Sequence, residues 1–216
     1  MTEEKYIISE KIFSSDLKSK AGIILFGVGG IALLGIITAE VLYPSYSTLQ
    51  EISDLGASRP PNSVIQQPSA TIFNTTMLVS GALVLIATYL LYREYERRDL
   101  PISLGLFGLG IFGVGVFPGN VVPWHQIFAL ITFFGGGVAA VVSSRVVEGP
   151  FKYLSMLFGG ISLLVLLSVV FLGEANPLSF LGLGGIERWV VYPILLWATG
   201  FGGYLMGQAN PSKISK

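Results

Sequence analysis

The sequence predicts an all-α, polytopic membrane protein: a six-transmembrane-helix bundle with an extracytoplasmic cap loop. Of the 216 residues, 52% are hydrophobic and only 12% are charged, about half the charged share of a soluble domain. Mean hydropathy is +0.70. The apolar residues form long continuous runs without the two-residue alternation of a transmembrane β-barrel. These three observations indicate that lipid is the main solvent of the chain.

Six stretches are long and apolar enough to cross a bilayer, which takes ~20 residues in a helix. They cover residues 21–42, 68–92, 101–117, 124–142, 153–172 and 188–207. The third is the shortest, so it spans the hydrocarbon core only when it stands upright. The first is not predicted to be a signal peptide, because it follows a largely polar segment and no convincing cleavage site ends it.

The segments outside these stretches complete the domain organisation. Residues 1–20 mix large apolar side chains with lysines, which predicts a cytoplasmic amphipathic tail on the membrane face, with a frayed tail as the alternative. Residues 21–207 are the transmembrane domain, and residues 208–216 are a cytoplasmic C-terminal tail.

Lysine and arginine lie almost entirely on one side of the predicted bundle. Of the 13 basic residues, only Arg59 and Arg188 fall on the side opposite the termini. Cytoplasmic loops carry an excess of Lys and Arg. We therefore predict a multi-pass protein of the cell membrane with cytoplasmic N- and C-termini.

The longest connection, residues 43–67, lies on the outer side of this topology. Structureless loops of more than ~12–15 residues are uncommon in compact domains. This connection also carries four apolar side chains that can dock on the bundle: Leu49, Ile52, Leu55 and Ala57. We expect it to fold as a cap that includes a short helix.

Glycine is concentrated in the third stretch, at Gly105, Gly108, Gly110, Gly113 and Gly115. Gly108, Gly110 and Gly113 match the spacing of the dinucleotide fingerprint, but that fingerprint needs a preceding strand. In lipid, small residues instead let helix backbones approach closely. We interpret the five glycines as helix-packing positions and predict that the third helix is central.

The scarce polar groups near the predicted spans gather at the outer end. The candidate ligand-binding or headgroup-binding residues are Glu40, Asp54, Asn74, His125, Glu187 and Arg188. Charges at a membrane interface are inexpensive, so the same layer also fits an ordinary interface. In that interpretation Arg188 pairs with Glu40 or Asp54 as a structural clamp. The residues are compatible with both interpretations.

The residue types restrict the chemistry. The chain has no cysteine and a single histidine, which excludes disulfides, thiolate metal sites, bis-histidine haem and zinc sites built on two histidines. We predict no metal and no cofactor. A carboxylate beside His125 could do acid–base work, but Ser53 and Ser58 lack a nucleophile motif, so no catalytic residue is assigned. Balanced charge, 13 basic against 13 acidic residues, disfavours nucleic acid as a partner.

Short motifs carry a resemblance to a known family. The motifs are Tyr43-Pro44, Ser53-Asp54-Leu55-Gly56-Ala57, Phe73-Asn74, Gly113-Val114-Gly115-Val116-Phe117-Pro118, His125 and Gly185-Ile186-Glu187-Arg188. In their order and spacing, the chain resembles an archaeal and bacterial membrane family catalogued as domain of unknown function 998. The resemblance covers nearly the whole chain beyond residues 1–20. It implies a six-helix membrane domain and brings no established activity. Four residues match the family's recurring polar positions: Asp54, His125, Glu187 and Arg188. The family pattern leads us to expect an acid after Phe-Pro, and this chain departs from the pattern because it has Gly119 there.

Three functions are compatible with these observations. The leading hypothesis is a protein that binds or acts on a lipid or other amphiphile at the outer polar cluster, with membrane lipids as partners. The alternative is a structural or accessory subunit that packs against another membrane protein through glycine-rich helices. The third is a small transporter or channel, which the absence of ionisable groups at the helix centres disfavours.

Overall fold

The computed structural model describes residues 3–208, with side chains from residue 17 onward except that of Glu174. Six long helices account for most of this range: α1 (Glu3–Val41), α2 (Ser69–Glu94), α3 (Asp99–Val116), α4 (Trp124–Ser143), α5 (Pro150–Leu172) and α6 (Gly182–Gln208). Three short 3₁₀ helices lie in the connections: η1 (Ile52–Leu55), η2 (Gly173–Ala175) and η3 (Ser179–Leu181). Within the described range there is no strand, and all six long helices contain a segment able to cross a membrane. The predicted fold class is confirmed.

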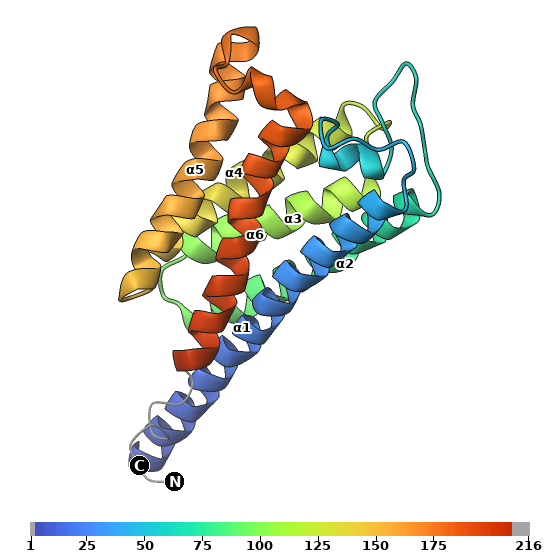
Figure 1. Cartoon of the computed structure of the whole chain (residues 1–216). Coiled ribbons are helices and arrows are strands. Elements are labelled where there is room, and N and C mark those ends of the chain that lie inside the picture. Colours follow the sequence, from blue (N-terminus) through green and yellow to red (C-terminus); the bar gives the residue numbers. More distant parts are fainter. Residues whose placement is uncertain (1–2, 209–216) are drawn as a thin grey trace.

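Two helices start more than one turn earlier than hydropathy predicts. The α1 backbone is helical from Glu3, so the polar N-terminal segment continues into the first span, Leu17–Val41, without a break (Figure 1). The amphipathic pattern predicted for residues 1–20 depends mostly on side chains that lie outside the described ones, and residues 209–216 of the C-terminal tail also lie outside the described range. Helix α6 starts at Gly182, so Glu187 and Arg188 lie inside its first two turns.

The six helices form a closed ring in chain order. Each long helix packs against its neighbours in sequence, α1 closes the ring against α6, and α4 also touches α6. Connections of a few residues join α2 to α3, α3 to α4 and α4 to α5, which makes each of these pairs an antiparallel hairpin. Helix α3 has the largest buried share of the six spans, yet its extensive contacts are confined to α2 and α4.

The glycines of α3 lie at close helix contacts. An added Cβ at Gly110 would be 2.5 Å from the backbone nitrogen of Thr132 in α4, far closer than two such atoms approach. At Gly105 the nearest atom, in α2, would be 3.3 Å away, so this contact is the loosest of the five. The remaining three would also meet a neighbouring helix within 3 Å: Gly108, Gly113 and Gly115.

The outside of the ring is apolar. Large hydrophobic side chains are more than two-thirds exposed on α5, for example Tyr153, Leu164 and Phe171. A continuous apolar belt of this kind would be unstable in water, but it is the normal surface of a helix in contact with lipid.

The connections divide between two ends of the ring. The beginning of α1 and the end of α6 lie at one end, together with the α2–α3 and α4–α5 connections (Figure 1). The opposite end carries residues 42–68, 117–123 and 173–181. We call this second end the cap side and residues 42–68 the cap segment.

Candidate functional site

The cap segment docks on the bundle through η1 and the residues that follow it. Ile52, Leu55 and Ala57 are buried, and η1 is the short helix that the sequence led us to expect. Leu49 was expected to dock as well, and this is wrong because its side chain is 64% exposed. Leu49 lies beside Gly182 at the start of α6.

Arg188 fastens the cap segment to two helices. Its Nη2 pairs with Glu40 at the end of α1 and donates to Tyr46 Oη at 2.9 Å. Its Nη1 donates to the carbonyl oxygens of Thr48 at 3.0 Å and Gln50 at 3.2 Å. The predicted pairing of Arg188 is therefore confirmed for Glu40. Since the protein itself accepts from both terminal nitrogens, Arg188 has little donor capacity left for a ligand.

The start of α6 approaches the cap backbone closely. The N–H of Gly184 donates to the carbonyl oxygen of Leu49 at 3.0 Å. A Cβ at Gly184 would lie 1.8 Å from the carbonyl oxygen of Gln50, so only glycine permits this contact. Tyr46 completes the attachment by donating to the carbonyl oxygen of Glu51 at 3.0 Å. Burial raises the pKa of Tyr46 to about 12, which keeps this hydroxyl neutral. Together with Arg188 and Glu40, these contacts form what we call the cap clamp.

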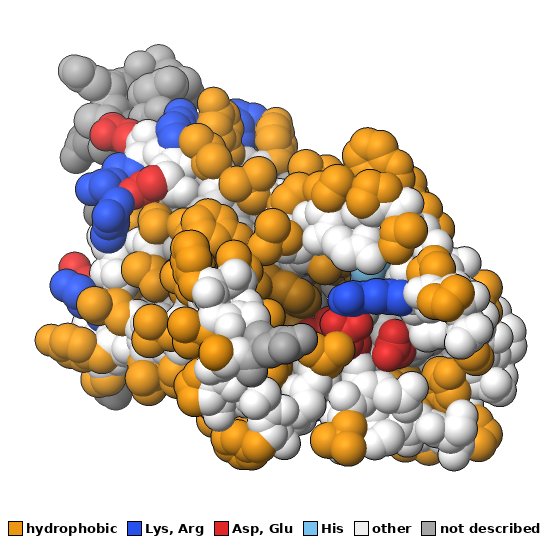
Figure 2. All heavy atoms as spheres, turned by 90° about the horizontal axis from the view of Figure 1, so that it is seen from above, with side chains coloured by type: hydrophobic (Ala, Val, Ile, Leu, Met, Phe, Trp, Pro, Cys, Tyr) orange, Lys and Arg blue, Asp and Glu red, His pale blue; other side chains and the backbone are white. Residues whose placement is uncertain are grey.

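A second group of charges lies on the cap segment itself. Arg59 Nη2 and Glu51 Oε1 are 2.7 Å apart. Burial raises the pKa values of Glu51 and Asp54, and the positive charge of Arg59 partly opposes both shifts. In Figure 2, acidic and basic side chains on the right of the view meet at the edge of a hollow between hydrophobic groups.

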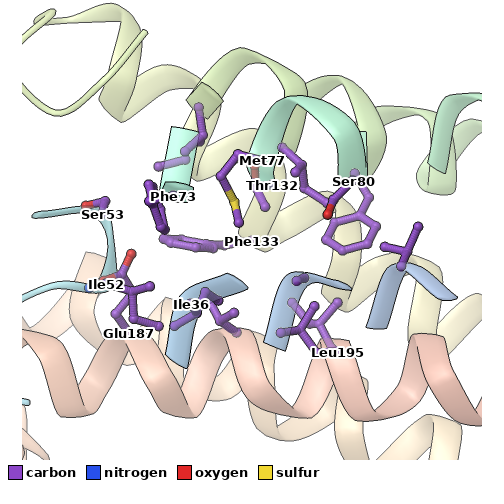
Figure 3. A pocket seen from close by; sticks show the side chains of 18 of the residues that line it. Ile36, Ile52, Ser53, Phe73, Met77, Ser80, Thr132, Phe133, Glu187 and Leu195 are labelled. Atoms are coloured by element: carbon purple, nitrogen blue, oxygen red, sulfur yellow. The ribbon is translucent and has the colours of Figure 1, made fainter. Parts of the chain in front are cut away.

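Beneath the cap segment lies a cavity of about 60 Å³, with room for several water-sized groups or part of a larger molecule (Figure 3). Its wall is mostly apolar and comes from α1, α2, α3, α4, α6 and η1. Ser53 and Glu187 lie at one end and Ser80 at the other, as Figure 3 shows. We call this space the central cavity. Its lining residues include Val28, Ala32, Ile36, Phe73, Met77, Phe107, Ile111, Val114, Ala129, Phe133, Val191 and Leu195.

His125 lines the central cavity and is only 2% exposed. Its Nδ1 lies 2.8 Å from the carbonyl oxygen of Phe117, in the loop before α4. A carbonyl oxygen can only accept, so Nδ1 carries the proton and donates it. In the neutral ring Nε2 is then an acceptor, and it has no hydrogen-bond partner among the side chains and backbone that the structure describes.

Glu187 lines the same cavity and connects α6 to the cap. Its Oε2 accepts from the backbone N–H of Ile52, the first residue of η1, which has no partner inside that short helix. Two serines add hydroxyls to the wall. Ser80 Oγ is fully buried without a hydrogen-bond partner, and the Ser53 hydroxyl has none among the described residues.

The six candidate residues predicted from the sequence all lie on the cap side, in separate arrangements. His125 and Glu187 line the central cavity, whereas Glu40 and Arg188 belong to the cap clamp. Asp54 is in η1 and does not pair with Arg188. Asn74 approaches the cap only weakly: its Nδ2 is 3.5 Å from the carbonyl oxygen of Gly56, and its buried Oδ1 has no partner in the described part of the chain.

Sequence reasoning missed Ser80 and Thr132 in the cavity wall. Single hydroxyl residues in an apolar helix are common and give no signal of a cavity. Ser53 stands in one of the family-like motifs, so its position carried a signal even though it was not chosen. Among the described residues no group of three or more His, Asp or Glu side chains is placed to hold a metal ion.

The departure at Gly119 has a structural reason. A Cβ there would lie 2.0 Å from the carbonyl oxygen of Ala57 in the cap segment. In this chain the α3–α4 loop and the cap backbone are in direct contact, which leaves no space for an acidic side chain.

The fold and the cavity define a polytopic membrane protein with six candidate membrane spans and a cap over a cavity. The family model described as "Protein of unknown function (DUF998)" matches residues 24–203, and the chain belongs to this family. No curated protein and no solved structure matches the chain with significant similarity.

Proposed function

We propose that this protein binds a lipid or other amphiphile, with part of the apolar chain in the central cavity and the polar group beneath the cap segment. The observation that carries the proposal is the distribution of side chains in the cavity wall. Apolar groups from five helices surround most of the space, whereas His125, Ser53 and Glu187 supply polar groups toward the cap side. A mostly apolar cavity with a few placed polar groups is the usual form of a ligand site.

The proposal divides the roles of the polar residues. His125 and Glu187 contact the bound molecule, because both line the cavity. Glu40 and Arg188 instead hold the cap segment closed, because their hydrogen-bonding capacity is used within the protein. Asp54 and Asn74 support the cap from η1 and α2.

Native mass spectrometry of protein purified in mild detergent tests this proposal. Val191 lines the cavity, so Val191→Phe fills space that the ligand needs. Val170 on α5 is 59% exposed, and Val170→Phe is the matched control. We expect co-purified lipid to be lost from Val191→Phe and kept by Val170→Phe, with both variants folded by thermal unfolding. Equal lipid retention by the two folded variants would contradict the proposal.

A second candidate function, a subunit that packs against another membrane protein, is favoured by a different observation. An added Cβ at Gly27, Gly30, Gly203 or Gly207 would meet no atom of the described residues within 4 Å. Outward-facing small residues let a partner helix approach closely. Cross-linking in the native membrane tests this: a partner should be captured from the wild type and lost from Gly203→Leu. Identical cross-linking patterns would argue against it.

We further infer that the cap side is extracytoplasmic and that both termini are cytoplasmic. Support comes from the distribution of basic residues, since only Arg59 and Arg188 of the 13 belong to the cap side.

A further inference from the structure

We propose that the polar group recognised in the central cavity is a neutral hydroxyl, so that the ligand is an amphiphilic alcohol rather than an anionic lipid. This inference rests on the proposed function and specifies the class of ligand. It combines three features of the cavity: the charges that line it, the hydrogen-bonding state of His125 and the unpaired hydroxyl of Ser53.

The charges around the cavity disfavour an anion. The described residues that line it include no lysine or arginine, and the one acidic side chain among them is that of Glu187. The two arginines of the cap side already have carboxylate partners, Arg188 with Glu40 and Arg59 with Glu51. A phosphate or carboxylate in the cavity would therefore lie near Glu187 without a cation to compensate it, and an uncompensated buried charge is strongly unfavourable.

The hydrogen-bonding state of His125 calls for a donor. Phe117 accepts from Nδ1, so Nε2 of the neutral ring can only accept. A hydroxyl on the ligand can donate to Nε2, whereas a ketone or an ester carbonyl cannot. A carbonyl ligand would leave Nε2 buried and unpaired, which costs affinity.

Ser53 supplies a donor for the oxygen of the same hydroxyl. Its own hydroxyl has no hydrogen-bond partner among the described residues, and it lies at the same end of the cavity as Glu187. It can donate to the oxygen of an alcohol that gives its proton to His125. The wall therefore offers both donors and acceptors without a net positive charge, which matches an alcohol.

Four eight-carbon probes that differ only in the polar group test this inference: octan-1-ol, octan-2-one, octanoate and octylamine. Binding of radiolabelled octan-1-ol is measured on the full chain in lipid nanodiscs, and the other three serve as competitors. The part of the binding that Val191→Phe removes and Val170→Phe retains is counted as cavity binding. We expect octan-1-ol to bind about tenfold more tightly than octan-2-one, and more tightly than either charged probe.

The His125→Asn variant tests the assigned acceptor directly. Its side-chain amide can still donate to the Phe117 carbonyl, but it removes the Nε2 position. Octan-1-ol and octan-2-one should then bind with affinities within about twofold of each other. Ser63→Ala, in the exposed part of the cap segment, should keep the wild-type preference.

The outcomes separate the two proposals. If none of the four probes shows binding sensitive to Val191→Phe, both the proposed function and this inference are overturned. If the probes bind in the cavity but the wild type prefers octan-2-one, octanoate or octylamine, or does not discriminate, the proposed function stands and the hydroxyl assignment is wrong.

Discussion

Replacing Arg188 by alanine is expected to loosen the cap segment and lower the free energy of unfolding by about 3 kcal/mol. The Arg188 side chain is only 13% exposed, and its loss leaves Glu40 without its cation. It also leaves the carbonyl oxygens of Thr48 and Gln50 without their charged donor. Removing one partner of a buried pair costs ~3–5 kcal/mol. The lower end applies here because the Glu40 side chain is 21% exposed, so water can partly solvate it.

The matched control is Arg59→Ala. Arg59 pairs with Glu51 on the same side of the protein, but its side chain is 48% exposed. An exposed pair of this kind contributes ~1 kcal/mol or less. Unfolding of each variant is measured by denaturant titration in mixed micelles, and opening of the cap by hydrogen exchange of residues 43–57. An Arg188→Ala protein within 1 kcal/mol of the wild type, with unchanged exchange in the cap, would refute the role assigned to the cap clamp.

Three further predictions test the fold, the cap and the topology. Gly110→Ala should destabilise the bundle by about 2 kcal/mol, because its Cβ would overlap the backbone of α4, whereas Gly203→Ala meets open space and should be neutral or stabilising in thermal unfolding. The raised pKa of Glu51 means that the folded cap binds a proton more readily than the unfolded chain. The contribution of Glu51 to the stability of the cap should therefore fall as pH rises from the ordinary pKa of 4.5 towards neutrality. Glu51→Gln should remove this pH dependence, measured by hydrogen exchange corrected for intrinsic rates. The chain has no cysteine, so single cysteines report topology cleanly: Ser63→Cys should react with an impermeant maleimide on intact cells and Glu148→Cys only after lysis, and the reverse pattern would invert the proposed orientation.

The spans could be predicted from the sequence because each is a continuous apolar run, and burial in lipid requires such a run. The start of α1 could not, because the polar residues from Glu3 onward give no hydropathy signal. The Arg188–Glu40 pair was predictable only as one of two alternatives. Hydropathy shows at which end of the helix bundle a charged residue lies, but not where it lies around the ring of helices. Asp54 was the other alternative, and the fold places it on η1, where it does not pair with Arg188.

The central cavity could not be predicted from the sequence. Its wall combines three or four residues from each of five helices with two from η1, and its existence depends on how their side chains fail to fill the middle of the ring. His125 was selectable because it is the only histidine, and Glu187 because a carboxylate beside an apolar span is rare. Ser80 had no such distinction, and only its burial without a partner marks it.

Photoaffinity labelling with a diazirine-bearing fatty alcohol tests the central claim, that the cavity beneath the cap holds an amphiphile. The label is mapped by peptide mass spectrometry on the wild type and on Val191→Phe. We predict labelling of the cavity-facing peptides around Met77 and Ala129, lost in Val191→Phe. Labelling confined to exposed positions such as Leu164 and Phe171, and equal in both proteins, would contradict it.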